Sequence, residues 1–229
     1  MNPVQLTIEA SETHAVSGLL LLPKNAFACY VLAHGAGAGM THPFMTAVAD
    51  GLSHRGIATL RYQFPYMENG SKRPDRPPLA HAMVRAAVTA AARLTPELPL
   101  LAGGKSFGAR MTSQAQAEAP LPNVSGLAFI GFPLHPAGKP SDDRARHLLD
   151  VRIPMLFLQG TRDALADMDV FATVLGKLPA TTQSHLFEHA DHSFHVPARS
   201  GKTDKQVLEH ALDALAIWAR SLCPHENSD

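Results

Sequence analysis

Cysteine is scarce in this sequence, with only Cys29 and Cys223 among 229 residues. The two lie far apart and form no close-spaced pair of the kind that binds zinc or cycles between thiol and disulfide. Cys29 sits in an apolar run, where a free cysteine behaves as a small hydrophobic residue. The sequence therefore predicts neither a disulfide framework nor a cysteine-based metal or redox site.

Net charge is also absent, because 20 Lys and Arg residues balance 20 Asp and Glu residues. A protein that binds nucleic acid or an anionic membrane by electrostatic attraction carries an excess of positive charge, so neither partner is expected. No run approaches the ~18 apolar residues of a membrane helix. Residues 1–5 lack the basic and apolar segments of a signal peptide. We expect a soluble, cytoplasmic protein.

What the chain does contain is a regular alternation of strand and helix patterns. Residues 4–9 and 14–20 suggest a leading antiparallel pair, because apolar and polar residues alternate there. Further strands are expected at 27–33, 57–62, 98–102, 124–131, 153–159 and 184–188. Helices are expected at 43–55, 79–94, 107–119 and 167–178, with a short one at 142–149 and a last one begun by a Thr203–Gln206 capping box.

This alternation predicts an α/β fold with a mostly parallel sheet of about seven to eight strands and helices on both faces. The length suits a single domain spanning residues 1–229, and no repeat or linker interrupts it. The sequence does not define an oligomeric state.

Gly104-Lys105-Ser106-Phe107-Gly108 fits the pattern G-x-S-x-G. It follows a predicted apolar strand and precedes a predicted helix. On such a strained turn a serine hydroxyl projects from the carboxyl edge of a sheet, and the small flanking residues allow strand and helix to approach closely. The helix N-terminus and the amide of Phe107 would face a developing oxyanion. Ser106 is therefore the candidate nucleophile.

A phosphate-binding P-loop is a competing interpretation of Gly104-Lys105-Ser106. That motif requires a glycine five residues before Gly104, and the position is occupied by Pro99. The glycine-rich cradle of backbone amides is missing, which argues against nucleotide binding.

A serine nucleophile needs a base, and the base needs an acid to orient it. Asp163 follows the predicted strand 153–159, and His192 follows the predicted strand 184–188, in the chain order serine, acid, base. Two alternatives stay open for the base, His189 and His195. Asp167 and Asp169 are alternatives for the acid, although they fall in the next predicted helix and suit its N-terminus. Asp191 is expected to form loop hydrogen bonds.

The whole chain resembles the α/β-hydrolase superfamily, near the small, lidless dienelactone-hydrolase-like branch and the testis-expressed-protein-like hydrolases. The matching segments are residues 34–37 (HGAG), 104–108 (GKSFG), 132–135 (FPLH), 160–163 (GTRD) and 190–194 (ADHSF). The resemblance implies that the acid is Asp163 of G-x-x-D and the base is His192 of D-H-S-F. The dienelactone branch commonly uses cysteine as nucleophile, so Ser106 puts the dienelactone substrate in doubt.

The segment His34-Gly35-Ala36-Gly37 follows the strand 27–33, where this superfamily builds the second half of its oxyanion hole. We expect the amide of Ala36 to be the donor, with Gly37 as the next choice, in addition to Phe107. A merely flexible glycine loop is the alternative. His34 is expected to brace the loop.

Four further residues near strand ends or the elbow, together with His34, are candidates for the pocket. A polar contact with substrate and an ordinary surface or loop-bracing role are both open for each. The four residues are Arg61, Tyr62, Lys105 and His135.

These features predict a serine hydrolase that cleaves a carboxylic ester through an acyl-enzyme and needs no metal or organic cofactor. The expected partner is a small or flexible acyl substrate. Residues 132–141 are too short for a large lid, so we expect an open, shallow cleft walled partly by residues 65–78. The alternatives are a protein with this fold that binds a ligand without catalysis, and a thioesterase or peptidase with the same triad.

Overall fold

The computed structural model describes residues 1–11 and 14–223. Its centre is one eight-stranded sheet in the order β1-β2-β4-β3-β5-β6-β7-β8. The strands are β1 (Val4–Ser11), β2 (His14–Leu21), β3 (Ala28–Ala33), β4 (Ile57–Tyr62), β5 (Leu100–Lys105), β6 (Val124–Ile130), β7 (Met155–Gly160) and β8 (Thr182–Phe187). The predicted mostly parallel sheet is confirmed: β1, β2 and β4 pair antiparallel, and every pair from β4 to β8 is parallel.

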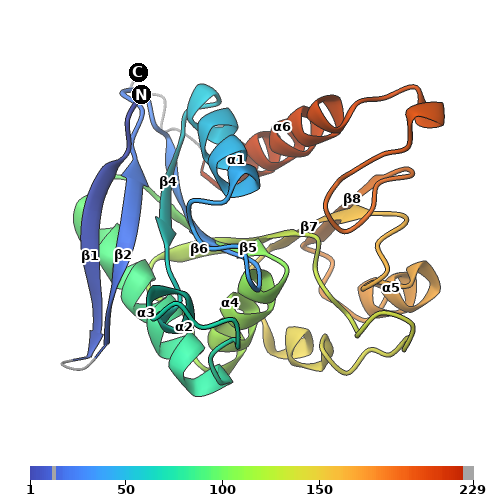
Figure 1. Ribbon diagram of the computed structural model, residues 1–229, viewed down its shortest axis with the longest axis horizontal. Coiled ribbons are helices and arrows are strands. Elements are labelled where there is room, and N and C mark those ends of the chain that lie inside the picture. Colours follow the sequence, from blue (N-terminus) through green and yellow to red (C-terminus); the bar gives the residue numbers. More distant parts are fainter. Residues whose placement is uncertain (12–13, 224–229) are drawn as a thin grey trace.

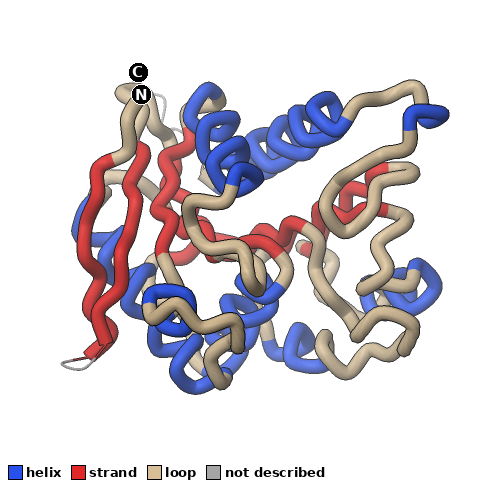
Figure 2. The backbone as a smooth tube through the Cα atoms, in the orientation of Figure 1, coloured by secondary structure: helices blue, strands red, loops and turns tan. Residues whose placement is uncertain are grey.

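Helices cover both faces of this sheet (Figure 1). They are α1 (Pro43–His54), α2 (Pro65–Glu68), α3 (Pro77–Leu94), α4 (Phe107–Glu118), α5 (Met168–Leu175) and α6 (Asp204–Leu222), with 3₁₀ turns at Arg146–Asp150 and Ala198–Ser200. One hydrophobic core joins the sheet to α1 and α6, and the other joins it to α3, α4 and α5. Figure 2 shows the strands as one twisted layer between these helices.

Strands buried on both faces explain the continuous apolar runs of the sequence. All six residues of β3 and all six of β7 are buried, as expected for central strands of a covered parallel sheet. Because parallel strands point the same way, the loops that follow β3, β5, β7 and β8 meet at one edge of the sheet. This edge carries the candidate site.

Several element boundaries differ from those predicted. β5 continues through Gly103 and Gly104 to Lys105, although the apolar pattern ends at residue 102. The short helix α2 lies within residues 65–78, where the prolines suggest only an irregular segment; Pro65 occupies the first helical turn, which tolerates proline. The short helix expected at 142–149 is a 3₁₀ turn at residues 146–150. The predicted capping box of Thr203 and Gln206 is confirmed at the start of α6.

Both cysteines are free and buried. Among the described residues, no helix combines the length and the low charge required of a membrane span.

Candidate functional site

Ser106 lies on the sharp turn between β5 and α4. Its backbone has φ 51° and ψ −109°, a strained conformation for a residue with a side chain. The Ser106 amide donates to the carbonyl of Ile130 on β6 at 3.3 Å, which ties the turn to the neighbouring strand. The strand–turn–helix geometry expected for a nucleophile is therefore present.

The two glycines of the G-x-S-x-G motif allow this turn to sit against β3. A Cβ atom at Gly108 would lie 2.6 Å from the carbonyl oxygen of Ala33, and one at Gly104 would overlap the same carbonyl. Any larger residue would push α4 or β5 away from β3. The motif spacing is thus a packing requirement as well as a chemical one.

Three polar side chains from different loops form a continuous hydrogen-bonded chain at this edge. The Ser106 hydroxyl lies 2.9 Å from Nε2 of His192, and Nδ1 of His192 donates to Oδ2 of Asp163 at 2.7 Å. Ser106 follows β5, Asp163 follows β7 and His192 follows β8. The His192 side chain is 26% exposed, whereas the Asp163 side chain is fully buried. One imidazole nitrogen thus reaches the hydroxyl and the other is held by a carboxylate.

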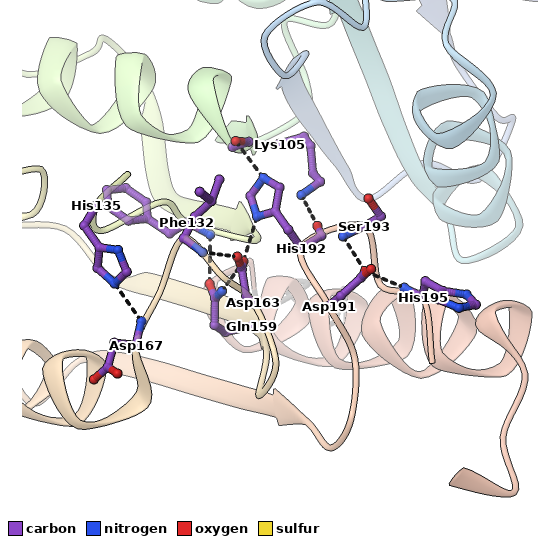
Figure 3. A network of polar contacts seen from close by, with 12 residues as sticks. Lys105, Phe132, His135, Gln159, Asp163, Asp167, Asp191, His192, Ser193 and His195 are labelled. Atoms are coloured by element: carbon purple, nitrogen blue, oxygen red, sulfur yellow. Dashed lines mark hydrogen bonds and ion pairs between the residues drawn. The ribbon is translucent and has the colours of Figure 1, made fainter. Parts of the chain in front are cut away.

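Asp163 is surrounded by hydrogen-bond donors (Figure 3). In addition to His192, Nε2 of Gln159 donates to Oδ2 at 2.6 Å, and the amide of Leu165 donates to Oδ1 at 2.8 Å. Burial by itself would raise the pKa of this carboxyl. The hydrogen bond and charge of His192, the Leu165 amide and the charge of Lys105 outweigh burial and hold the pKa below its usual value.

The alternative bases and acids lie elsewhere. His195 is exposed and binds Asp204 at 2.8 Å, while His189 is near Glu188 at 3.4 Å. Asp167 caps the N-terminus of α5 by accepting from the amides of residues 169 and 170. Asp169 lies in the first turn of that helix. The structure brings only His192 and Asp163 of these candidates into the chain that reaches Ser106.

Asp191 organises the loop that carries His192. Its Oδ1 accepts from the amides of Ser193 and His195 at 2.7 and 3.0 Å, and its amide donates to the carbonyl of His195 at 2.9 Å. This is the loop hydrogen-bonding role expected from the sequence. The interactions fold residues 191–195 into a compact loop that presents the imidazole to the elbow.

The loop after β3 provides one side of the site. The amide of Gly37 donates to the hydroxyl of Tyr66 at 3.1 Å, so it already has an acceptor. Ala36 lines the cleft beside Ser106. Phe107 is the first residue of α4, and its amide has no acceptor within the helix. Of the three amides predicted as oxyanion donors, that of Gly37 is therefore already hydrogen-bonded to Tyr66.

His34 lies behind this loop and is fully buried. Its Nδ1 donates to the carbonyl of Gly35 at 2.8 Å, and its Nε2 accepts from the amide of Phe64 at 3.0 Å. Burial lowers the pKa of this imidazole to about 4, so it is neutral at physiological pH. His34 braces the loop, as expected, and does not line the cleft.

A cleft of about 560 Å³ opens over Ser106 and His192, and most of its exposed surface is apolar. Its other lining residues are Gly35, Ala36, Ala38, His42, Phe44, Met45, Lys105, Leu165 and Ser193. The expectation that residues 65–78 form part of the wall is wrong, because none of them lines the cleft; Tyr66 in that segment instead accepts a hydrogen bond from the amide of Gly37. The wall comes instead from the start of α1 and from Leu165.

Of the five predicted pocket residues, Lys105 lines the cleft and the other four do not. Arg61 is buried, and its guanidinium donates to the carbonyl of Met40 and to the hydroxyl of Thr46. Tyr62 is fully buried in the core. His135 accepts from the amide of Asp167 at 2.8 Å and binds the following carbonyl. Arg61 and His135 thus hydrogen-bond to neighbouring loops, and Tyr62 is part of the core.

Two residues of the site were not identified from the sequence. Gln159 donates to Asp163 and also accepts from the amide of Phe132 at 2.8 Å, so it links the loops after β6 and β7. Tyr66 binds the amide of Gly37. Gln159 has a local signal in the sequence, because a single amide side chain directly follows the apolar run 155–158. Tyr66 has no comparable local signal.

Within residues 1–11 and 14–223, no group of three or more His, Cys, Asp and Glu side chains is arranged to hold a metal ion.

Comparison with known proteins agrees with this architecture. The structure is similar to a dienelactone hydrolase from Anabaena variabilis, with a TM-score of 0.77 and 21% identity over 97% of this chain and 100% of that chain. It is similar to the esterase domain of a Rhodothermus marinus protein, with a TM-score of 0.73 and 18% identity over 96% and 99% of the two chains. A lidless α/β serine hydrolase from Xanthomonas campestris matches with a TM-score of 0.69 and 20% identity over 94% and 95%.

The match to a protein family covers most of the sequence. A family profile described as an alpha/beta hydrolase domain matches residues 26–220, which run from β3 into the last turn of α6 and include all three residues of the hydrogen-bonded chain. The chain therefore belongs to the α/β-hydrolase family, and its fold is like that of dienelactone hydrolase.

Proposed function

We propose that this protein is a serine hydrolase that cleaves carboxylic esters of small or flexible acyl groups. The observation that carries the proposal is the unbroken hydrogen-bonded chain from the strained Ser106 through His192 to the buried Asp163. Its position at the floor of a cleft gives an acyl group access to the hydroxyl.

In the first half of the reaction, Nε2 of His192 takes the hydroxyl proton while Oγ of Ser106 bonds to the carbonyl carbon of the ester. The buried, ionised Asp163 holds the imidazole in the required tautomer and stabilises the imidazolium. The tetrahedral intermediate then expels its alkoxide, which leaves as an alcohol after taking the proton from His192. The product of this half is an acyl-enzyme on Ser106.

In the second half, His192 takes a proton from a water molecule whose oxygen attacks the acyl carbon. Collapse of this second intermediate breaks the Oγ–acyl bond, and Oγ regains a proton from His192. In both intermediates the negative oxygen accepts from the amides of Ala36 and Phe107. Preorganised donors of this kind typically contribute ~10²–10³-fold each to the rate, because they cost no reorganisation at the moment of reaction.

The walls of the cleft support a preference for short acyl chains. Phe44, Met45 and Leu165 supply apolar surface, and the loop at residues 132–141 adds no lining residue to the cleft. We expect acetyl and butyryl esters to be cleaved faster than long-chain esters. A sustained preference for long-chain lipid esters would contradict this part of the proposal.

The test is hydrolysis of p-nitrophenyl acetate and butyrate by purified protein, combined with labelling by a fluorophosphonate. We expect Ser106→Ala to abolish labelling and to lower kcat by at least ~10³-fold, as for other serine nucleophiles. Ser113→Ala is a matched control, because the Ser113 hydroxyl also lies 2.8 Å from a histidine nitrogen, that of His147. Ser113 is fully buried and does not line the cleft over Ser106, so its loss should leave labelling unchanged.

The outcomes separate the alternatives. Equal activity of the wild type and Ser106→Ala would refute the proposal. A wild type that neither labels nor hydrolyses any ester would favour a fold kept for binding. If thioesters or peptides were turned over faster than esters, the proposed roles of Ser106, His192 and Asp163 would stand, but the substrate class would be thioesters or peptides.

A further inference from the structure

Lys105 occupies the position directly before Ser106, and its side chain runs away from the elbow toward the loop that carries His192 (Figure 3). The Nζ atom donates to the backbone carbonyl of His192 at 2.5 Å. This bond joins two residues 87 positions apart in the sequence. Lys105 thus precedes Ser106 in the chain and also hydrogen-bonds to the backbone of His192.

Two aromatic rings and the backbone after β6 surround part of the ammonium. It lies 5.9 Å from the ring centroid of Phe44 at the start of α1 and 5.7 Å from that of Phe194. Both distances are within the range of cation–π attraction. A Cβ atom at Gly131 would lie 2.7 Å from Nζ, so the end of β6 also fits closely around the group. These contacts leave the ammonium little freedom to move.

The titratable groups near this ammonium are two aspartates and a histidine of the cleft wall. Asp163 and Asp191 both attract it, and the imidazole of His42 shares the cleft wall at the start of α1. Burial lowers the pKa of Lys105 to about 8, although the two carboxylates partly oppose that effect. Near pH 7 the side chain is therefore mostly an ammonium, and its charge strengthens the hydrogen bond to the carbonyl.

We propose that Lys105 is a positioning residue, whose ammonium binds the His192 carbonyl and holds the imidazole at hydrogen-bonding distance from Ser106. The inference rests on the proposed function, because it assigns a role within the same reaction. A displacement of about 1 Å in a catalytic group can cost ~10²-fold in rate, which makes such an anchor valuable. Asp191 closes the loop on itself, but residues 189–195 form no helix or strand, so contacts such as the Lys105 bond fix the loop relative to the elbow.

A substrate-binding role is the competing interpretation, since Lys105 also lines the cleft. The two roles differ in the kinetic constant that they affect. A positioning residue acts on kcat for every ester, whereas a residue that binds an anionic substrate acts on KM for esters that carry a carboxylate. Neutral p-nitrophenyl esters and a p-nitrophenyl hemisuccinate distinguish the two.

The experiment compares the wild type, Lys105→Met, Lys105→Arg and the control Lys24→Met. Methionine keeps the apolar stem between Phe44 and Phe194 but cannot donate, whereas arginine keeps both the charge and the donors. Lys24 is exposed in the turn before β3, at the opposite edge of the sheet. For each protein, kcat and KM are measured from pH 6 to pH 10, together with the rate of fluorophosphonate labelling.

We expect Lys105→Met to lower kcat on neutral esters by ~10–100-fold, with little change in KM. Wild-type kcat should fall by ~3–10-fold to a plateau as the pH rises through about 8, because the neutral amine forms a weaker bond. This alkaline decline should be missing from Lys105→Met, and it should be missing from Lys105→Arg, which retains more activity than the methionine variant. Lys24→Met should behave as the wild type.

Three results would overturn the inference while leaving the proposed function intact. They are an unchanged kcat for a folded Lys105→Met, a change confined to KM for the anionic ester, and a wild-type kcat that stays constant between pH 7 and pH 10. The pH dependence of the wild-type kcat needs no variant, so it tests the inference even if Lys105→Met does not fold. A wild type that fails to label or turn over would instead refute the proposed function, and the positioning role with it.

Discussion

Replacement of Gln159 by methionine tests how the acid of the site is held. Gln159 is fully buried and makes two hydrogen bonds, one from its Nε2 to Asp163 and one from the amide of Phe132 to its Oε1. Methionine has a similar length and shape but makes neither bond. The change removes the polar contacts without opening a large cavity.

The expected loss of stability follows from these two bonds. An unsatisfied buried amide at Phe132 costs about 1–3 kcal/mol, and a lost bond to the charged Asp163 costs about 1.5–3 kcal/mol. Gln116→Met is the matched control, because Gln116 is also buried and accepts from the amide of Leu121 at 2.8 Å, a neutral backbone donor. Both variants leave one backbone amide unsatisfied, so we expect Gln159→Met to lower the free energy of unfolding by about 1.5–3 kcal/mol more than Gln116→Met.

The effect on activity should depend on pH. The pKa of Asp163 is held below its usual value in the folded protein, so the carboxylate stays charged at mildly acidic pH. Loss of the Gln159 donor raises that pKa, and the protonated acid can no longer orient His192. The ratio of mutant to wild-type kcat/KM should therefore be lower at pH 4.5 than at pH 8. The stability that the ionised carboxylate contributes should likewise be lost at a higher pH in the mutant.

The assays are urea-induced unfolding at pH 7 and ester hydrolysis between pH 4.5 and pH 8. Gln116→Met should lose stability but keep the wild-type dependence of rate on pH. Equal destabilisation by the two substitutions, combined with identical pH profiles, would show that Gln159 does not support Asp163.

Two further predictions concern the loops around Ser106. Tyr66→Phe removes the acceptor of the Gly37 amide and loosens the residue 35–38 loop, so we expect kcat on p-nitrophenyl butyrate to fall by about 5-fold, in line with the ~1 kcal/mol of a typical hydrogen bond. An unchanged kcat would mean that the loop is held by other contacts. Gly108→Ala forces a Cβ against the carbonyl of Ala33, and overpacking of this kind costs about 1–3 kcal/mol, which thermal unfolding would detect. Gly176→Ala is its control, because a Cβ there meets only ordinary contacts and φ is −63°, so stability should rise by about 0.4–1 kcal/mol. Equal melting temperatures for the two alanine variants would refute the packing argument.

Local patterns in the sequence were sufficient for most of the fold. The apolar runs predict the strands buried on both faces, and the period of 3.6 predicts the amphipathic helices that cover them, including α6 with its capping box. The short helix α2 was missed, because the stretch around it is rich in proline and polar residues. Its helical turn depends on tertiary contacts, including the hydrogen bond from the amide of Tyr66 to Asp75 and the burial of the Tyr66 ring.

The sequence by itself determined the strand–turn–helix segment at Ser106 and the candidate serine, acid and base with their order along the chain. Each candidate lies in a short motif whose residues are within a few positions of one another. Local patterns left His189 and His195 open beside the His192 that the family resemblance implies. The tertiary structure decided which of them reaches the serine, since Ser106 and His192 are 86 residues apart and the order of β5 to β8 in the sheet brings them together. It also decided that Gly37 is bound by Tyr66, that Gln159 supports Asp163 and that Lys105 joins the elbow to the base loop. These contacts lie at the carboxyl edge of the sheet, where no local periodicity specifies which side chains will meet.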